Sequence, residues 1–364
     1  MAYQKFTGLT NANAIMAKIS EYAANQGWVV LANNIDDLPI DGSSTVDGLR
    51  LSIKSPDGSV FGHFRSANGK SIFQSQKNTS NAHGIGLTCS TAFTLNPASG
   101  KWYDQPNAPL HHGTQEVIGV GIPINPSGIH TLYINSMMDP APMLVISVET
   151  SGVFQHLAVG CLEKTGDWNG GVIFSGSRNS YNMFSINFDP IAIESDSDPI
   201  FCMTTKANTF LRIDIDAAPL RYPSVLWASA GSNAADISSC FTGKQLALPV
   251  KTNEVAAQAW NAKIPDYIKL QSKSTIDTGR NVNTLNCITV NMNLNAYVLR
   301  DPDGLRNFSP VGYVPGVYFI SMRNIAPGQV YEISYPQSGN LHQVFPYTRR
   351  RGVFGFDGFS VQQS

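Results

Sequence analysis

The 364-residue chain combines 42% hydrophobic residues with only 14% Asp, Glu, Lys and Arg, and its formal net charge is −1. This apolar content is ample for cores in two or three domains. The near-neutral charge argues against a chain that coats nucleic acid, because neutralising phosphates needs a basic excess. An ordinary soluble domain carries roughly 25% charged residues, so Asn, Ser, Thr, Gln and Gly must supply the polar surface. Neutral polar surfaces of this kind suit packing into large assemblies.

The chain has no run of about 18 apolar residues that would span a bilayer. Its start, MAYQKFTGLTNANAIM, lacks the charged, apolar and small-residue regions of a signal peptide. We therefore expect synthesis in a cytoplasm and no membrane span. Five scattered cysteines without C-x-x-C spacing favour buried free thiols over disulfides or a zinc site. They stand at positions 89, 161, 202, 240 and 287.

The first predicted element is a helix near the N-terminus, with Asn11 or Asn13 as its cap and Gly27 as its stop. Its apolar residues share one helical face: Ile15, Met16, Ile19, Tyr22 and Ala23. After Trp28 the pattern changes to period two in WVVLAN, GLRLSIK, VFGHFRS and KSIFQS. The turn SPDGS predicts a hairpin over residues 49–66. Helix and meander together form an expected N-terminal module, residues 1–80.

Residues 81–240 form the expected central domain. Short strand candidates separated by Gly, Pro, Asn and Ser are typical of an antiparallel sandwich. Nothing alternates strand with helix as a doubly wound nucleotide-binding fold does. The candidates are EVIGVGIPI, HTLYINS, MLVISVE, VFQHLAVGCLE, GGVIFSG, YNMFSINF, TFLRIDI and SVLWAS.

The expected C-terminal domain, residues 241–364, begins with a weaker helix candidate, NEVAAQAWNAKIPDYIK, which Pro265 limits to the residues before it. Strand patterns resume in NTLNCITVNM, GVYFISM, QVYEISY and HQVFPYTRRRGVFGFDGFSVQQS. No short fixed repeat supports a solenoid or propeller. The predicted fold class is mainly β, with antiparallel sandwich-like domains, an N-terminal helix and few other helices.

The stretch MLVISVETSGVFQHLAVGCLE, residues 143–163, places a histidine and a cysteine close together in an apolar run. Its Thr-Ser-Gly segment predicts a hairpin connection. Because side chains alternate along a strand, His156 and Cys161 point to opposite faces, which excludes the contact of about 3 Å between a nucleophile and its base. We expect a neighbouring subunit to cover Phe154 and His156, and the domain's own core to contain Leu157, Val159 and Cys161.

The remaining polar clusters are typical of loops. His111 and His112 are adjacent, so their side chains diverge, and the H-E-x-x-H spacing is absent. The string ESDSDP, with Glu194, Asp196 and Asp198, lacks the further ligands of a calcium loop. Pro302 and Gly304 in DPDG, residues 301–304, are typical of a turn, which is a sufficient explanation for the two carboxylates there. Because no nucleophile elbow, P-loop or Rossmann fingerprint appears, we expect no enzyme, no catalytic residue, no cofactor and no metal.

Two surface features leave alternatives open. Arg349, Arg350 and Arg351 form the only dense charge run. They either contact an acidic surface of a neighbouring subunit, since Arg pairs well with carboxylates, or lie in a solvated loop before the last strand. An alternative function is receptor or glycan binding, in which aromatic rings stack on sugars; the candidate residues are Trp102, Tyr103 and Trp168.

Three stretches together resemble a family of virion structural proteins from tailed bacteriophages. The first is NANAIMAKISEYAANQGWVVL followed by DGLRLSIKSPDGSVFGHFRS, which is similar to the helix, Gly-Trp and hairpin opening of these proteins. The second is HTLYINSMMDPAPMLVISVETSGVFQHLAVGCLEK, and the third is PGVYFISMRNIAPGQVYEISYPQSGNLHQVFPYTRRRGVFGFDGFSV. The resemblance touches both ends and the centre of the chain and includes no catalytic motif, so it implies no active-site residues.

The resemblance, the low charge and the β content lead us to expect a non-enzymatic structural subunit of a phage virion. It would work as a symmetric homo-oligomer in the tail, baseplate or neck, with other virion proteins as partners and no sequence-specific binding of nucleic acid. Assembly would take place in the host cytoplasm. Its subunit faces would each bury on the order of 1,000 Å² or more.

Overall fold

A computed structural model describes the chain at residues 2–33, 48–68, 83–110, 117–179, 200–201, 208–214, 225–229, 246–247, 292–300, 307–321, 325–333, 339–346 and 357–363. Three sequence predictions lie outside these residues: the strands KSIFQS and YNMFSINF and the second helix NEVAAQAWNAKIPDYIK. NTLNCITVNM also lies outside them except for its last residue, which begins a strand.

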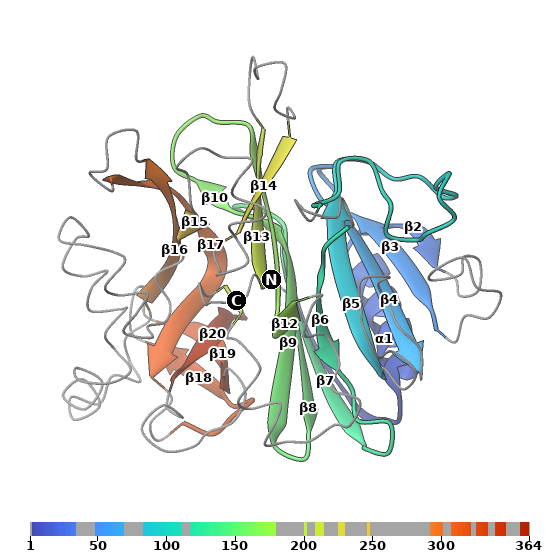
Figure 1. The fold of residues 1–364 in the computed structure, drawn as a ribbon. Helices are drawn as coiled ribbons and strands as arrows, with labels where there is room; N and C mark the ends of the chain where they lie inside the picture. Colours follow the sequence, from blue (N-terminus) through green and yellow to red (C-terminus); the bar gives the residue numbers. More distant parts are fainter. Residues whose placement is uncertain are drawn as a thin grey trace.

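Three antiparallel sheets are stacked in layers (Figure 1). The central sheet has the order β1 (Ala2–Leu9), β7 (His130–Met137), β8 (Met143–Thr150), β9 (Val153–Cys161), β11 (Gly170–Gly176), β13 (Thr209–Asp214) and β14 (Val225–Ser229). The helix-side sheet has the order β12 (Arg178–Asn179), β6 (Val120–Pro123), β5 (His83–Ser90), β4 (Phe61–Asn68), β3 (Arg50–Lys54) and β2 (Val29–Asn33).

The C-terminal sheet has the order β15 (Leu246–Ala247), β16 (Met292–Arg300), β17 (Asn307–Ser321), β20 (Asp357–Gln362), β19 (Asn340–Pro346) and β18 (Val330–Ile333), and β10 (Glu163–Lys164) pairs with β17. Together with α1 (Ala12–Asn25), the one helix in the described part of the chain, these sheets confirm the predicted fold class.

Helix α1 forms as its sequence predicts. The side chain of Asn11 accepts a hydrogen bond of 2.9 Å from the backbone N–H of Ala14, which is N-cap geometry. Gly27 ends the helix with a φ of +82°, a conformation that glycine adopts without a Cβ penalty. The predicted apolar face is buried throughout: Ile15, Met16, Ile19, Tyr22 and Ala23.

The face of α1 packs into a first core, which we define as the apolar layer between the central and helix-side sheets. The helix-side sheet contributes Leu51, Phe64 and Leu87, and the central sheet contributes Leu157 and Val159. The predicted hairpin between β3 and β4 carries part of this layer, with Lys54 paired to Phe61 across the SPDGS turn. In Figure 1 the helix-side sheet and α1 lie on one side of the central sheet.

A second core fills the layer between the opposite face of the central sheet and the C-terminal sheet. Tyr133 and Phe154 of the central sheet meet Phe345 and Phe359 of the C-terminal sheet there. Because the central sheet is covered on both sides, every residue of β9 is buried.

The strand pairing crosses both domain boundaries that the sequence suggested. β1, from the expected N-terminal module, pairs with β7, and β4 pairs with β5 across residue 80. β10 of the expected central domain pairs with β17. Strand pairs therefore join residues on both sides of positions 80 and 240. Local strand patterns carry no information about pairings between residues far apart in the chain.

Candidate functional site

The β8–β9 hairpin contains the histidine that the sequence singled out. Its two-residue turn places Ser151 at φ +51° and Gly152 at φ +78°, the left-handed geometry that matches the twist of a tight hairpin. His156 is fully buried on the face toward the C-terminal sheet. Its Nε2–H donates to the carbonyl oxygen of Pro346 at 2.8 Å, and its Nδ1 lies 2.8 Å from the hydroxyl of Ser147.

The chain's own C-terminal sheet covers the face of β9 that carries Phe154 and His156. Phe154 is only 3% exposed, and the rings of Phe345 and Phe359 lie 6.1 and 4.8 Å from the His156 ring. Phe154 and His156 are therefore closed off from a neighbouring subunit, contrary to the expectation from sequence. An apolar strand face looks the same whether a distant part of the chain or another chain covers it.

Cys161 lies on the opposite face, as strand alternation predicts. It belongs to the first core with Leu157 and Val159. Burial raises the pKa of its thiol to about 11, and the hydroxyl of Ser59 lies 3.3 Å from its sulfur. A thiol with a raised pKa is a poor nucleophile at neutral pH. The hairpin thus uses its histidine and its cysteine to pack two different layers.

The aromatic residues named for glycan binding are buried or bonded to other residues of this chain. Trp102 and Tyr103 are 0% and 4% exposed and pack edge to face in a small cluster of their own. Trp168 is half-buried; its indole N–H donates to the carbonyl of Val311 at 3.1 Å, and the ammonium of Lys164 lies 5.6 Å from the ring centre. Trp102 and Tyr103 therefore present no ring face to a sugar.

Several predicted loop features fall on residues that the structure does not describe. They are Arg349, Arg350 and Arg351, the pair His111 and His112, the acidic string 194–198, and the DPDG turn at 301–304.

A buried polar layer on the outer face of the helix-side sheet was missed by sequence reasoning. Arg50, Arg65 and Arg178 are 0–3% exposed and lie in one rung across the strands, with Gly86 and Gly121 between them. The period-two pattern of GLRLSIK and VFGHFRS places these polar side chains on one face of the strands and does not tell what covers that face. Residues of the 91–110 segment cover this face, and the Arg50 guanidinium lies 5.7 Å from the ring centre of Phe93.

His63 sits in the next rung of this layer, fully buried. The hydroxyl of Ser90 donates to the Ala92 carbonyl, so Nε2–H of His63 donates to Ser90 Oγ at 2.7 Å and Nδ1 accepts from Ser52 Oγ at 3.0 Å. Burial, and secondarily the charge of Arg50, lower the pKa of His63 to about 3. The ring is therefore neutral at physiological pH and serves as a bridge between strands.

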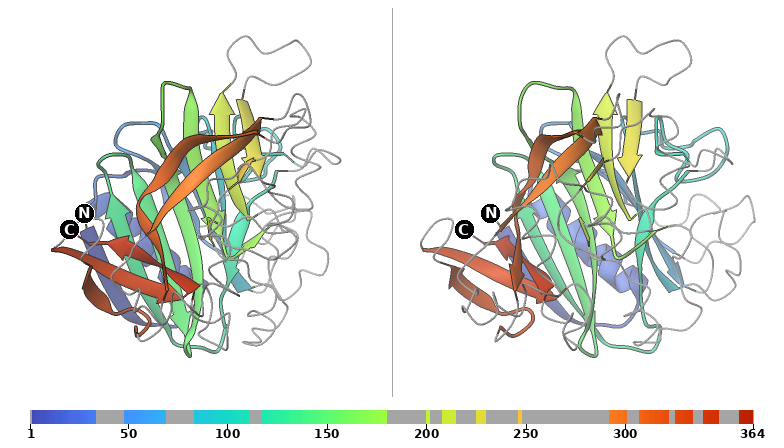
Figure 2. Two further views of the ribbon diagram at one scale, coloured as in Figure 1. Left: turned by 90° about the vertical axis from the view of Figure 1, so that its left-hand side faces the viewer. Right: turned by 60° about the vertical axis from the view of Figure 1, so that its left-hand side comes forward.

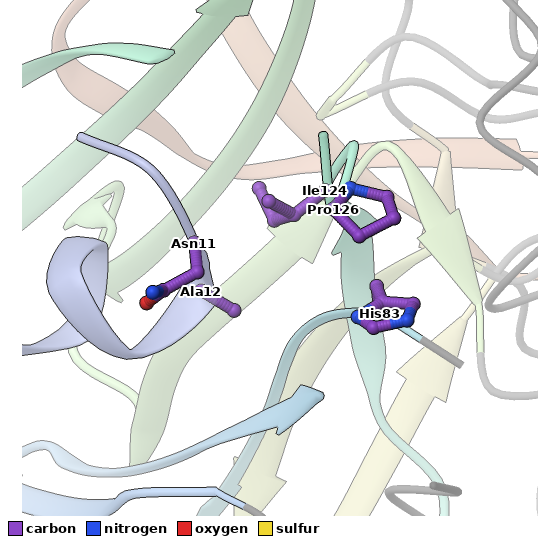
Figure 3. Close-up of a pocket in the computed structure, with 5 residues that line it drawn as sticks. All are labelled: Asn11, Ala12, His83, Ile124 and Pro126. Atoms are coloured by element: carbon purple, nitrogen blue, oxygen red, sulfur yellow. The ribbon is translucent and has the colours of Figure 1, made fainter. Parts of the chain in front are cut away.

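One cavity of about 310 Å³ opens beside the start of α1 (Figure 3). Asn11, Ala12, His83, Ile124 and Pro126 line it. Most of this lining is apolar, and the side-chain oxygen of Asn11 is already used to cap the helix. Among the described lining residues, His83 alone adds a polar side chain beside Asn11, which is too few to make the set of convergent polar groups that fixes a ligand.

In the described residues, no group of three or more His, Cys, Asp or Glu side chains is placed to hold a metal ion. Within the same residues, no helix has the length and apolar character to cross a membrane. Neither a known protein family nor a curated protein sequence matches this chain.

Proposed function

We propose that this chain is a non-enzymatic structural subunit of a tailed-bacteriophage particle, acting as a symmetric oligomer in the tail, baseplate or neck. The observation that carries the proposal is how the chain uses its reactive side chains. His63 and His156 bridge strands through both ring nitrogens, and His130 joins β8 to the loop residue Asn125 in the same way. Cys89 and Cys161 are buried thiols with raised pKa values.

Three further features support the proposal. The chain carries few charges, 14%, and many neutral polar residues, which favours close subunit packing over repulsion. Its layers bury both faces of the central sheet, so the fold is a stiff block that can hold neighbours in register. The three stretches described above resemble virion structural proteins. The chain would then act by holding neighbouring subunits in register, through subunit contacts of standard interface size.

The test is to locate the chain and its oligomer. We expect the purified chain to form a symmetric oligomer in light scattering and negative-stain images, and a labelled antibody to mark particles released by cells that encode it. Replacing Arg349, Arg350 and Arg351 with Ser should weaken the oligomer if these arginines contact a neighbouring subunit, and should leave it unchanged if they lie in a solvated loop. A persistent monomer that is absent from particles would contradict the proposal.

A further inference from the structure

β1 differs from its neighbours in the central sheet by its exposure. It is the end strand of that sheet in the described part of the chain. Gln4, Lys5, Thr7 and Gly8 are exposed, whereas every residue of β9 is buried. An end strand presents a row of backbone N–H and C=O groups on its outer side, and such a row is a template for another strand.

The C-terminal sheet projects past this edge. On β19, Phe345 packs against Tyr133 of β7 with ring centres 5.4 Å apart, and Gln343 donates to the hydroxyl of Tyr3 on β1 at 3.0 Å. Leu341 comes two residues further along the same face of β19 and is 42% exposed. β19 therefore crosses from the interior of the central sheet to its edge, and its first residues project beyond β1. Figure 2 shows both chain ends together beside these strands.

β18 extends the projecting surface. Val330 pairs with Gln343, and Glu332 pairs with Leu341, so the side chains of Val330 and Glu332 share the face of Leu341. Val330 is also 42% exposed, and Glu332 is exposed. We call the exposed side chains of Leu341 and Val330 the overhang. The overhang and the outer edge of β1 together form a step. An extended segment laid along β1 would gain backbone hydrogen bonds from the edge and apolar contact from the overhang.

The step carries two charged side chains, Glu332 on the overhang and Lys5 on β1, and a residue that pairs with β1 opposite Lys5 meets the charge of Lys5 as its cross-strand neighbour. Lys5 points to the same side of the central sheet as Tyr3, and its ammonium lies 5.2 Å from the Tyr133 ring centre. It makes no ion pair with any residue that the structure describes. A second copy of β1 would bring its own Lys5 to this edge, and facing like charges are destabilising. A segment with an acidic residue at this position is attracted instead.

We propose that the step formed by β1 and the overhang of Leu341 and Val330 binds an extended segment of a different protein, which carries an acidic residue opposite Lys5. This inference rests on the proposed role as an assembly subunit and names the surface and the partner chemistry for it. Lys5 also rejects segments with a basic residue there, which gives selectivity at an otherwise sequence-tolerant backbone contact.

The experiment uses the purified full chain and two labelled eight-residue peptides of alternating threonine and valine. One has a central glutamate and the other a central lysine. We expect anisotropy titrations to show at least about fivefold tighter binding of the glutamate peptide. Lys5→Glu should reverse the preference, while the matched change Lys54→Glu on β3 should leave it intact. Hydrogen exchange should slow at β1 amides and stay unchanged in β9.

Leu341→Ser is a second test variant, because this side chain is exposed and its replacement leaves the core untouched. It should weaken binding of both peptides. Equal binding of the two peptides to the native chain would overturn the inference, as would protection of amides away from β1. Peptide binding is measured on the isolated chain, so a positive result beside absence from phage particles would refute the proposed function alone.

Discussion

Single side chains that carry potential chemistry serve as structural bridges in this protein. His130 shows the same arrangement as His156: Nε2–H donates to the carbonyl of Asn125 at 3.0 Å, and Nδ1 lies 2.6 Å from the hydroxyl of Thr150. Buried polar groups must find partners or cost free energy. Histidine supplies a donor and an acceptor on one flat ring, so it can join two strands inside an otherwise apolar layer.

Buried neutral histidine predicts a stability loss in acid. The pKa of His63 is about 3 in the fold against an ordinary 6.5, so the unfolded chain binds the proton first as the pH falls. Stability from this residue is complete above about pH 6.5 and declines toward pH 3, by roughly 1.4 kcal/mol per pH unit at most. We expect urea unfolding of His63→Asn to show a flatter pH dependence between pH 6.5 and 5 than the native chain.

His83→Asn is the control, since His83 is only partly buried. It should leave most of the pH dependence in place. An unchanged slope in His63→Asn would show that His63 is not the titrating group, and attention would pass to His342, whose pKa burial lowers to about 4.

At the scale of single elements, turns and caps follow local sequence closely. Asn11 caps α1 and Gly27 ends it, both at positions that the sequence predicted. The SPDGS turn joins β3 to β4, and a two-residue turn joins β8 to β9. These features depend on residues near one another in the chain, so pattern reasoning reaches them.

The β8–β9 turn can be tested directly. Gly152 has a φ of +78°, and a Cβ placed there would meet no atom within 4 Å, so only backbone strain opposes a side chain. We expect Gly152→Ala to lower the free energy of unfolding by about 1 kcal/mol. Gly152→Asn should cost less, because Asn tolerates the left-handed region. Chemical denaturation midpoints compare the two; an alanine variant as stable as the native chain would contradict the turn geometry.

At the scale of the whole molecule, the central sheet ties the layers together. Its two faces carry the two cores, β1 joins it from the far N-terminus, and the His156–Pro346 hydrogen bond links it to the C-terminal sheet. Contacts of this kind join residues far apart in sequence. They join the three sheets to one another.

This coupling predicts one unfolding transition. Phe64 lies in the first core and Phe345 in the second, and both are fully buried. Replacing either with Ala should cost about 3–5 kcal/mol, and calorimetry should show the same single transition moving down in both variants. Two separate transitions, with Phe345→Ala shifting only one of them, would show that the layers unfold independently.

Sequence reasoning found much of the fold and little of the site. The helix, the β3–β4 and β8–β9 hairpins and most described strands follow the periodicity of their residues. β1 was missed because the apolar residues of AYQKFTGL do not alternate with polar ones in a period of two. Phe154, Trp102 and Tyr103 were placed on surfaces and are buried. Periodicity tells which side chains share a face, and it does not tell what covers that face.

The sequence by itself determined the β-rich class, the position of the helix and the separation of His156 from Cys161, because each depends on local geometry with a fixed repeat. Only the tertiary structure decided which strands pair across the expected boundaries, that the C-terminal sheet covers His156, and that three arginines lie buried in one rung. These outcomes depend on contacts between distant segments, whose energies come from packing of whole layers and leave no local pattern.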